Sequence, residues 1–141
     1  MLKRFCCAVL GVLICVGLSF AQWQTPENVG DVVNSDMDEV RACISPDGKT
    51  LYFSSNRDGR MDVWMATKVV DEWQNLTKLP SPINTDDDDW LAHISSDGDS
   101  MFFISDRSPS LDYDVYKSWK NGGNWQQPLL LPPPVNSDFT E

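Results

Sequence analysis

Residues 45–64 read SPDGKTLYFSSNRDGRMDVW, and most of this segment returns further along the chain. Residues 95–98 repeat its first turn as SSDG, residues 101–103 repeat its apolar triplet as MFF, and Arg57 returns as Arg107. The last three letters, DVW, return as DVY at residues 114–116. A sequence that keeps this many anchors in phase, with a period of 50 to 52 residues, is typical of a repeat protein in which each unit is one supersecondary element.

The flanks of this segment belong to the same repeat. Trp23-Gln24 recurs at residues 73–74 and 125–126, and the triplet Asn34-Ser35-Asp36 recurs as NTD at residues 84–86 and NSD at 136–138. We therefore divide the chain into repeats at about residues 23–72 and 73–124, followed by an incomplete third repeat at 125–141.

Each repeat predicts four short strands. In the first four-stranded unit these strands cover residues 40–44, 50–54, 61–67 and 73–79, the last of them past the repeat boundary at residue 72. Pro-Asp-Gly and Asn-Arg-Asp-Gly turns separate the first three strands. The second and third strands are apolar on both faces, which is expected when each sheet is packed between two neighbours. The prediction is an all-β fold, a partial β-propeller of two complete four-stranded blades and the start of a third.

Residues 45–64 resemble the TolB-like, WD-type propeller repeat, and the preceding W-Q-x-P…V-N-S-D-x-D-E segment (23–39) resembles the linker between such blades. The second repeat departs from this pattern, because Ser96 replaces the proline and Arg107-Ser108-Pro109 lacks the glycines of the hairpin. The resemblance implies a protein of the bacterial envelope. It also implies that the chain is part of a longer propeller, with a ring assembled from several chains as the alternative.

The N-terminus has the pattern of a signal peptide. Lys3 and Arg4 precede an apolar run at residues 5–20, and Ser19-Phe20-Ala21 offers a cleavage site. We expect residues 1–21 to be removed, leaving 22–141 as an exported domain with no stable membrane span. Ile14 before Cys15 makes lipidation the weaker interpretation. The expected location is periplasmic or extracellular, with outer-membrane association as one form of it.

The charge of the chain excludes two classes of partner. The formal net charge is −10, and loss of Lys3 and Arg4 with the signal makes it more negative. Such a surface repels nucleic acid and anionic lipid. A protein, or peptidoglycan or another envelope polysaccharide, is the expected partner.

Acidic residues gather after the recurring asparagine, where we expect exposed loops at one rim of the propeller. Asn34 and Asn84 should hydrogen-bond their own backbone in these loops. A Ca²⁺ site is the alternative for the loops, although the spacing is not that of an EF-hand. We expect the rim to attract a cationic partner. The candidate binding residues are Asp36, Asp38, Glu39, Asp86, Asp88 and Asp89.

A second group of polar residues recurs in each repeat, which favours structural over catalytic roles. A catalytic group is needed once, whereas a structural one is needed in each blade. We expect the Ser-x-Asp-Gly residues to form turns. We expect each arginine and aspartate to fasten its hairpin, by bonding the turn backbone or each other. The structural candidates are Asp47, Gly48, Arg57, Asp62, Asp97, Gly98, Arg107 and Asp114.

The remaining reactive side chains do not compose a catalytic or metal site. Cys43 is the one cysteine after residue 21, and it lies in an apolar strand where an inert buried thiol is expected. His93 is the one histidine, and we expect it in the core or facing the channel. Trp23, Trp73 and Trp125 share one repeat position and should pack between blades, with stacking on a sugar as the alternative.

We therefore expect no catalytic residue, no metal and no cofactor. The predicted function is a non-catalytic binding or scaffolding module of the cell envelope. The alternative is the propeller domain of a secreted enzyme, either a serine peptidase gating domain or a sialidase-like glycosidase, whose catalytic part lies elsewhere.

Overall fold

The computed structural model describes residues 25–107 and 112–137. The predicted signal peptide (1–21) and Trp23 lie outside these residues. Within them the protein is all-β, with nine strands and no α-helix. None of the described elements is a helix long and apolar enough to cross a bilayer.

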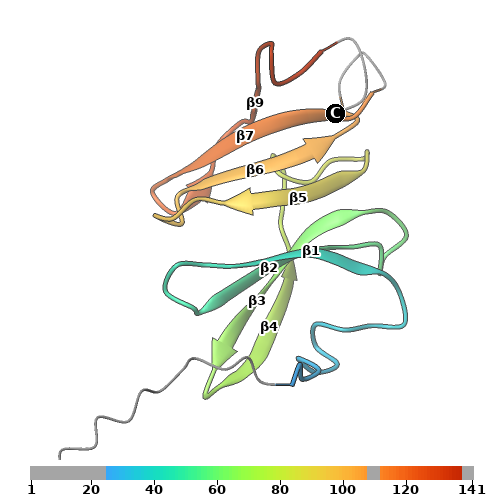
Figure 1. Cartoon of the computed structure of the whole chain (residues 1–141), viewed down its shortest axis with the longest axis vertical. Helices are drawn as coiled ribbons and strands as arrows, with labels where there is room; N and C mark the ends of the chain where they lie inside the picture. The colour runs from blue at the N-terminus through green and yellow to red at the C-terminus, as the bar shows by residue number, and fades with distance from the viewer. Residues whose placement is uncertain (1–24, 108–111, 138–141) are drawn as a thin grey trace, which may run out of the picture.

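The first sheet contains four antiparallel strands in sequence order (Figure 1). Its strands match the predicted ones to within two residues at each end. They are β1 (Glu39–Ile44), β2 (Thr50–Ser55), β3 (Asp62–Val69) and β4 (Glu72–Lys78).

The second sheet repeats this order but divides its outer strand. It contains β5 (Asp89–Ile94), β6 (Ser100–Ser105), β7 (Asp114–Asn121), β8 (Asn124–Trp125) and β9 (Leu129–Leu130). Both β8 and β9 pair with β7. Pro128 lies between them, at the repeat position of Leu76 in β4. Because proline has no N–H to donate to a sheet, the outer strand is interrupted there.

The sheet boundaries differ from the predicted repeat boundaries. Trp73, which opens the second sequence repeat, lies in β4 of the first sheet, and Trp125 lies in β8 of the second. The second and third sequence repeats therefore each contribute their first strand to the preceding sheet.

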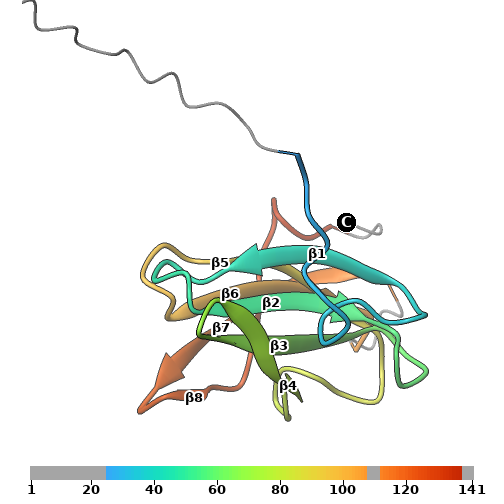
Figure 2. The same ribbon diagram turned by 90° about the horizontal axis from the view of Figure 1, so that it is seen from below.

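The two sheets pack face to face, as consecutive blades of a propeller do, and the chain crosses from one to the other between β4 and β5 (Figures 1 and 2). The interface is an apolar cluster that contains Tyr52 and Val63 of the first sheet and Leu91, Met101 and Phe103 of the second. The last three of these side chains are completely buried. Burial of this surface is the main stabilising term that joins the sheets.

A second, smaller cluster covers the other face of the first sheet. Val33, from the segment before β1, packs there with Leu51, Phe53 and Ala66. The side chains of β2 are therefore buried on both faces, as predicted for a sheet that is covered on both sides.

Cys43 and His93, the two remaining reactive side chains, lie on the first strand of each sheet. Cys43 is a free thiol packed against the cluster between the sheets. His93 is exposed on β5 rather than buried in the core. A bulge between Leu91 and His93, which has a counterpart between Val40 and Cys43 in β1, shifts the register at this point.

Candidate binding site at the acidic rim

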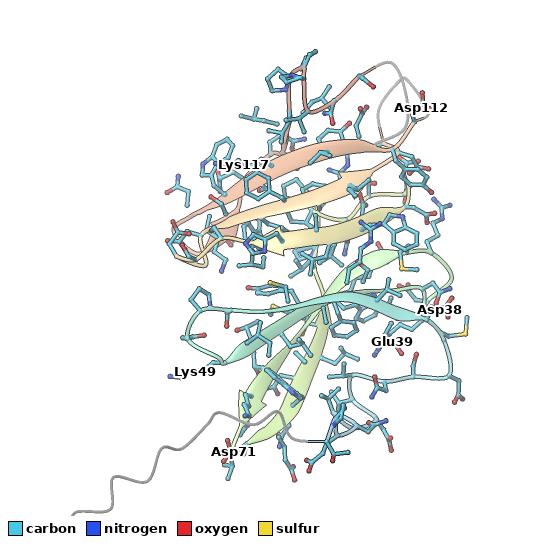
Figure 3. All side chains as sticks on the ribbon, viewed as in Figure 1. Asp38, Glu39, Lys49, Asp71, Asp112 and Lys117 are labelled. Atoms are coloured by element: carbon cyan, nitrogen blue, oxygen red, sulfur yellow. The ribbon has the colours of Figure 1, made fainter. Side chains whose placement is uncertain are left out.

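Two loops that occupy the same position in the two repeats lie at one edge of the sheets. The first (34–38) leads into β1 and the second (84–88) leads into β5. In Figure 3, Asp38 and Asp112 lie at this edge, whereas Lys49 and Lys117 lie towards the other. We call this edge, formed by residues 34–38, 56–60, 84–88, 106 and 112, the acidic rim.

The same hydrogen bonds shape both loops. In the first loop, the backbone N–H of Ser35 donates to Glu39 Oε2 at 2.9 Å, and the Ser35 hydroxyl donates to Glu39 Oε1 at 2.6 Å. In the second, the N–H and hydroxyl of Thr85 bond Asp89 Oδ2 at 2.7 and 3.0 Å. The carboxylate at the start of each first strand therefore fixes the loop that precedes it.

Each of these carboxylates also forms an ion pair with an arginine from the hairpin between the second and third strands of the same sheet. Arg57 Nη2 lies 2.9 Å from Glu39 Oε1, and Arg107 Nη2 lies 2.5 Å from Asp89 Oδ1. In the first sheet, the same guanidinium donates to the carbonyls of Val32 and Val33.

The second arginine repeats these contacts. Arg107 donates to the carbonyls of Pro82 and Ile83, and its Nε donates to the Ser105 hydroxyl at 2.9 Å. We call each set, an arginine with its carboxylate and two carbonyls, an arginine latch. A fork of donors that spans a carboxylate and two carbonyls suits arginine and not lysine.

The latches remove two of the predicted binding residues from the rim surface. Asp89 is completely buried and Glu39 is only 12% exposed. Burial opposes ionisation of Glu39, but hydrogen bonds from Ser35, Ser55 and Arg57 outweigh it and lower its pKa to about 2. Both carboxylates are thus paired with arginine and covered by the protein, and the expectation that they lie exposed at the rim is corrected.

The other predicted rim residues are exposed or half-buried. Asp36, Asp38 and Asp86 are exposed, and so is Asp87 beside them. Asp88 is half-buried and accepts hydrogen bonds from Met61 N at 3.1 Å and from the Tyr113 hydroxyl at 3.4 Å.

Asp88 and its neighbours make this part of the rim electronegative. Burial raises the pKa of Tyr113, and the charges of Asp88 and Asp106 raise it further. Asp88 also links the loop to the hairpin of the first sheet through Met61, so the rim is continuous across both sheets.

Arg57 and Asp62 do not pair with each other, contrary to one form of the hairpin prediction. Arg57 reaches back to the segment before β1, as described above. Asp62 is buried, and its Oδ2 accepts from Lys78 Nζ, which also lies 2.9 Å from Asp58. Burial raises the pKa of Asp62, and the hydrogen bond from Lys78 offsets only part of this rise. The equivalent residue, Asp114, is likewise buried at the start of β7.

The Ser-x-Asp-Gly turns lie at the edge opposite the rim. Asp47 Oδ1 accepts from the Ser45 hydroxyl at 2.6 Å and from Lys49 N at 3.0 Å, which lowers its pKa. Asp97 makes the same contacts in the second repeat. Gly48 and Gly98 have φ values of 72° and 76°, in the left-handed region that glycine adopts without strain.

The recurring asparagine has a role that the sequence did not indicate. Asn84 does not bond its own loop but lies buried against the first sheet. Its Oδ1 accepts from Val63 N, and its Nδ2 donates to the carbonyls of Val63 and Leu79, all at 2.8 Å. Asn136 repeats these contacts on the second sheet. Asn34 instead donates to Asn28.

Among residues 25–107 and 112–137, no three metal-ligating side chains converge on one point.

No protein-family model matches the chain, and no curated protein matches it. A solved structure, TolB from Acinetobacter baumannii, is similar over 62% of this chain with 18% sequence identity and a TM-score of 0.44. The match spans 20% of the TolB chain, so this chain covers about a fifth of that protein.

Proposed function

We propose that the protein is a non-catalytic binding module of the cell envelope, which presents the acidic rim to a partner protein with a basic surface. The observation that carries this proposal is the contrast between the two sets of rim carboxylates. Glu39 and Asp89 are neutralised by arginine, whereas Asp36, Asp38 and Asp86 are exposed on loops that those buried pairs hold in place.

This arrangement favours binding over catalysis. Preorganised exposed charges of one sign raise the local concentration of an oppositely charged partner and speed its association. The polar groups that recur, by contrast, are occupied in latches and turns in both repeats. The predicted signal peptide and the resemblance of the repeat to the TolB-like type support a location in the envelope, where proteins and polysaccharides are available as partners.

A lysine-rich synthetic peptide provides a test with the full chain. We expect the double substitutions Asp36→Asn/Asp38→Asn and Asp86→Asn/Asp87→Asn each to weaken peptide binding, measured by fluorescence anisotropy. The effect should be largest at low salt, because the Debye length shortens to about 10 Å at 0.1 M ionic strength.

The matched control removes the same charge at another place. Asp71→Asn/Glu72→Gln changes the net charge equally at the exposed turn between β3 and β4, and it should leave peptide binding unchanged. If the control weakens binding as much as the rim variants, the attraction belongs to the net charge and the proposed site is wrong. Binding of a neutral polysaccharide that is insensitive to the rim variants and to salt would also overturn it.

A further inference from the structure

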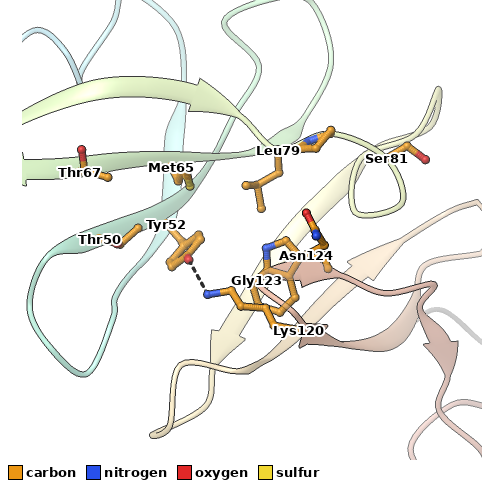
Figure 4. Close-up of a pocket in the computed structure, with 11 residues that line it drawn as sticks. Thr50, Tyr52, Met65, Thr67, Leu79, Ser81, Lys120, Gly123 and Asn124 are labelled. Carbon is orange, nitrogen blue, oxygen red and sulfur yellow. Dashed lines mark hydrogen bonds between the residues drawn. The ribbon is translucent and has the colours of Figure 1, made fainter.

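A cavity lies between the two sheets, and its lining differs from that of the equivalent cavity in the first repeat. It has a volume of about 400 Å³ and is partly open to solvent. Apolar and aromatic side chains from both sheets line it, among them Tyr52, Met65 and Trp125, together with Leu79 from the segment after β4 (Figure 4). This volume and lining are those of a small-molecule site.

One cation projects into this cavity. Lys120 Nζ lies 4.8 Å from the centroid of the Trp125 ring and 6.0 Å from that of Tyr52. It donates to the carbonyl of Gly98 at 3.1 Å and to the Tyr52 hydroxyl at 3.4 Å, the contact drawn in Figure 4. An ammonium group carries three donors, so the described partners leave one N–H of Lys120 for another acceptor.

The repeat supplies an internal comparison for this lysine. The equivalent corner of the first sheet also forms a cavity, with Lys68 in the place of Lys120 and Trp73 in the place of Trp125. There Lys68 Nζ lies 3.4 Å from Asp71 Oδ1, and Glu72 also lines the cavity.

In the second sheet, glycine and asparagine replace these two acids. Gly123 occupies the place of Asp71, and Asn124 occupies that of Glu72. The residues that line the cavity between the sheets therefore include one cation and no carboxylate. No carboxylate in the described part of the chain lies within 4.0 Å of Lys120 Nζ.

From this difference we infer that the cavity between the sheets binds a small organic carboxylate with an apolar or aromatic body. The carboxylate would accept from Lys120 and Asn124, and the body would pack against Tyr52, Trp125, Met65 and Leu79. In an acidic protein, a lysine without a carboxylate neighbour selects an anion, and partial enclosure by aromatic rings strengthens that charge-assisted hydrogen bond. This site is separate from the acidic rim and does not depend on the function proposed for it.

The test compares phenylacetate with phenylacetamide, which have the same ring and differ in charge. Titrated into the ¹⁵N-labelled full chain, phenylacetate should shift the Trp125 indole and Gly123 amide signals and should bind at least tenfold more tightly than the amide. Lys120→Met should weaken phenylacetate binding at least tenfold and abolish the preference for the anion. Lys68→Met, the same change in the other repeat, should have no effect.

A second variant keeps the inference testable if Lys120→Met does not fold. Gly123→Asp recreates the Lys68–Asp71 pair, and Asp71 already has φ 67° at this turn position, close to the 82° of Gly123. A Cβ at Gly123 meets no atom within 4 Å. Gly123→Asp should weaken phenylacetate binding at least tenfold. Equal binding of acid and amide, shifts at Trp73 instead of Trp125, or a Gly123→Asp protein that binds like the wild type would each overturn the inference.

Discussion

Substitution of Arg107 tests the latch that builds the rim. In Arg107→Met, Asp89 would keep its hydrogen bonds from Thr85 but lose its cation while it remains completely buried. The carbonyls of Pro82 and Ile83 would also lose their donors. Removal of one partner of a buried ion pair costs about 3–5 kcal/mol, and we expect the free energy of unfolding to fall by this amount.

A double-mutant cycle separates the ion pair from the carbonyl contacts. Asp89→Leu should also destabilise the protein, but the double variant should cost less than the sum of the two, with a coupling of about 0.5–3 kcal/mol. Arg57→Met should cost less than Arg107→Met, because Glu39 is 12% exposed and water can replace part of the lost interaction. Urea unfolding followed by tryptophan fluorescence measures all four variants.

Two results would contradict the role given to the arginine latch. If Arg107→Met lowers stability by less than about 1 kcal/mol, the value typical of one ordinary hydrogen bond, the latch does not hold the loop. Additive effects of Arg107→Met and Asp89→Leu would show that the two side chains act independently, and the account of the rim would be wrong.

Three further predictions concern pH, a second ion pair and export. Glu39 has a pKa lowered to about 2. Its stabilising contribution is therefore complete above its unfolded-state pKa and is lost as the pH falls from about 4.5 towards 2. Glu39→Gln should flatten this part of a stability–pH profile, and an unchanged slope would contradict the lowered pKa of Glu39. Lys78→Met should lower stability by about 1–3 kcal/mol in urea unfolding, because Asp62 stays buried with its Oδ1 already unpartnered, whereas Lys49→Met, at an exposed turn, should have little effect. Mass spectrometry of the exported protein should find Gln22 as the first residue, and an intact Met1 or a lipid on Cys15 would refute the signal-peptide prediction.

The strands and turns were predictable because their signals are local. Glycines at the turns, segments dense in β-branched and aromatic residues, and a period of 50 to 52 residues mark the strands of the first sheet to within two residues at each end. The break in the outer strand of the second sheet was not predicted, although Pro128 was visible in the sequence. Its effect depends on which neighbouring strand needs the missing N–H, and that is set by the pairing with β7.

The partners of the charged residues were less predictable, because they are distant in the sequence. A bond between Arg57 and Asp62, five residues away, was one of two expected roles, but Arg57 pairs with Glu39, eighteen residues back. One sequence signal did exist, since Glu39 and Asp89 are acids at the same repeat position, as Arg57 and Arg107 are arginines. Charges of both signs that recur at the same positions of the two repeats were compatible with an arginine latch, but only the fold shows that the two side chains meet.

The asparagine contacts described above have a consequence for how the protein unfolds. The segment between the sheets (79–88) is tied to β3 through Asn84, and to the second sheet through the hydrogen bonds of Arg107 to the carbonyls of Pro82 and Ile83. Neither sheet can open without freeing this segment, which also supplies Ile83 to their shared cluster. The two units are therefore coupled as nearest neighbours in a linear array, where the interface term sets the cooperativity. Amide protons in β3 and in β6 should accordingly exchange with solvent through one common opening reaction, and not through two independent ones.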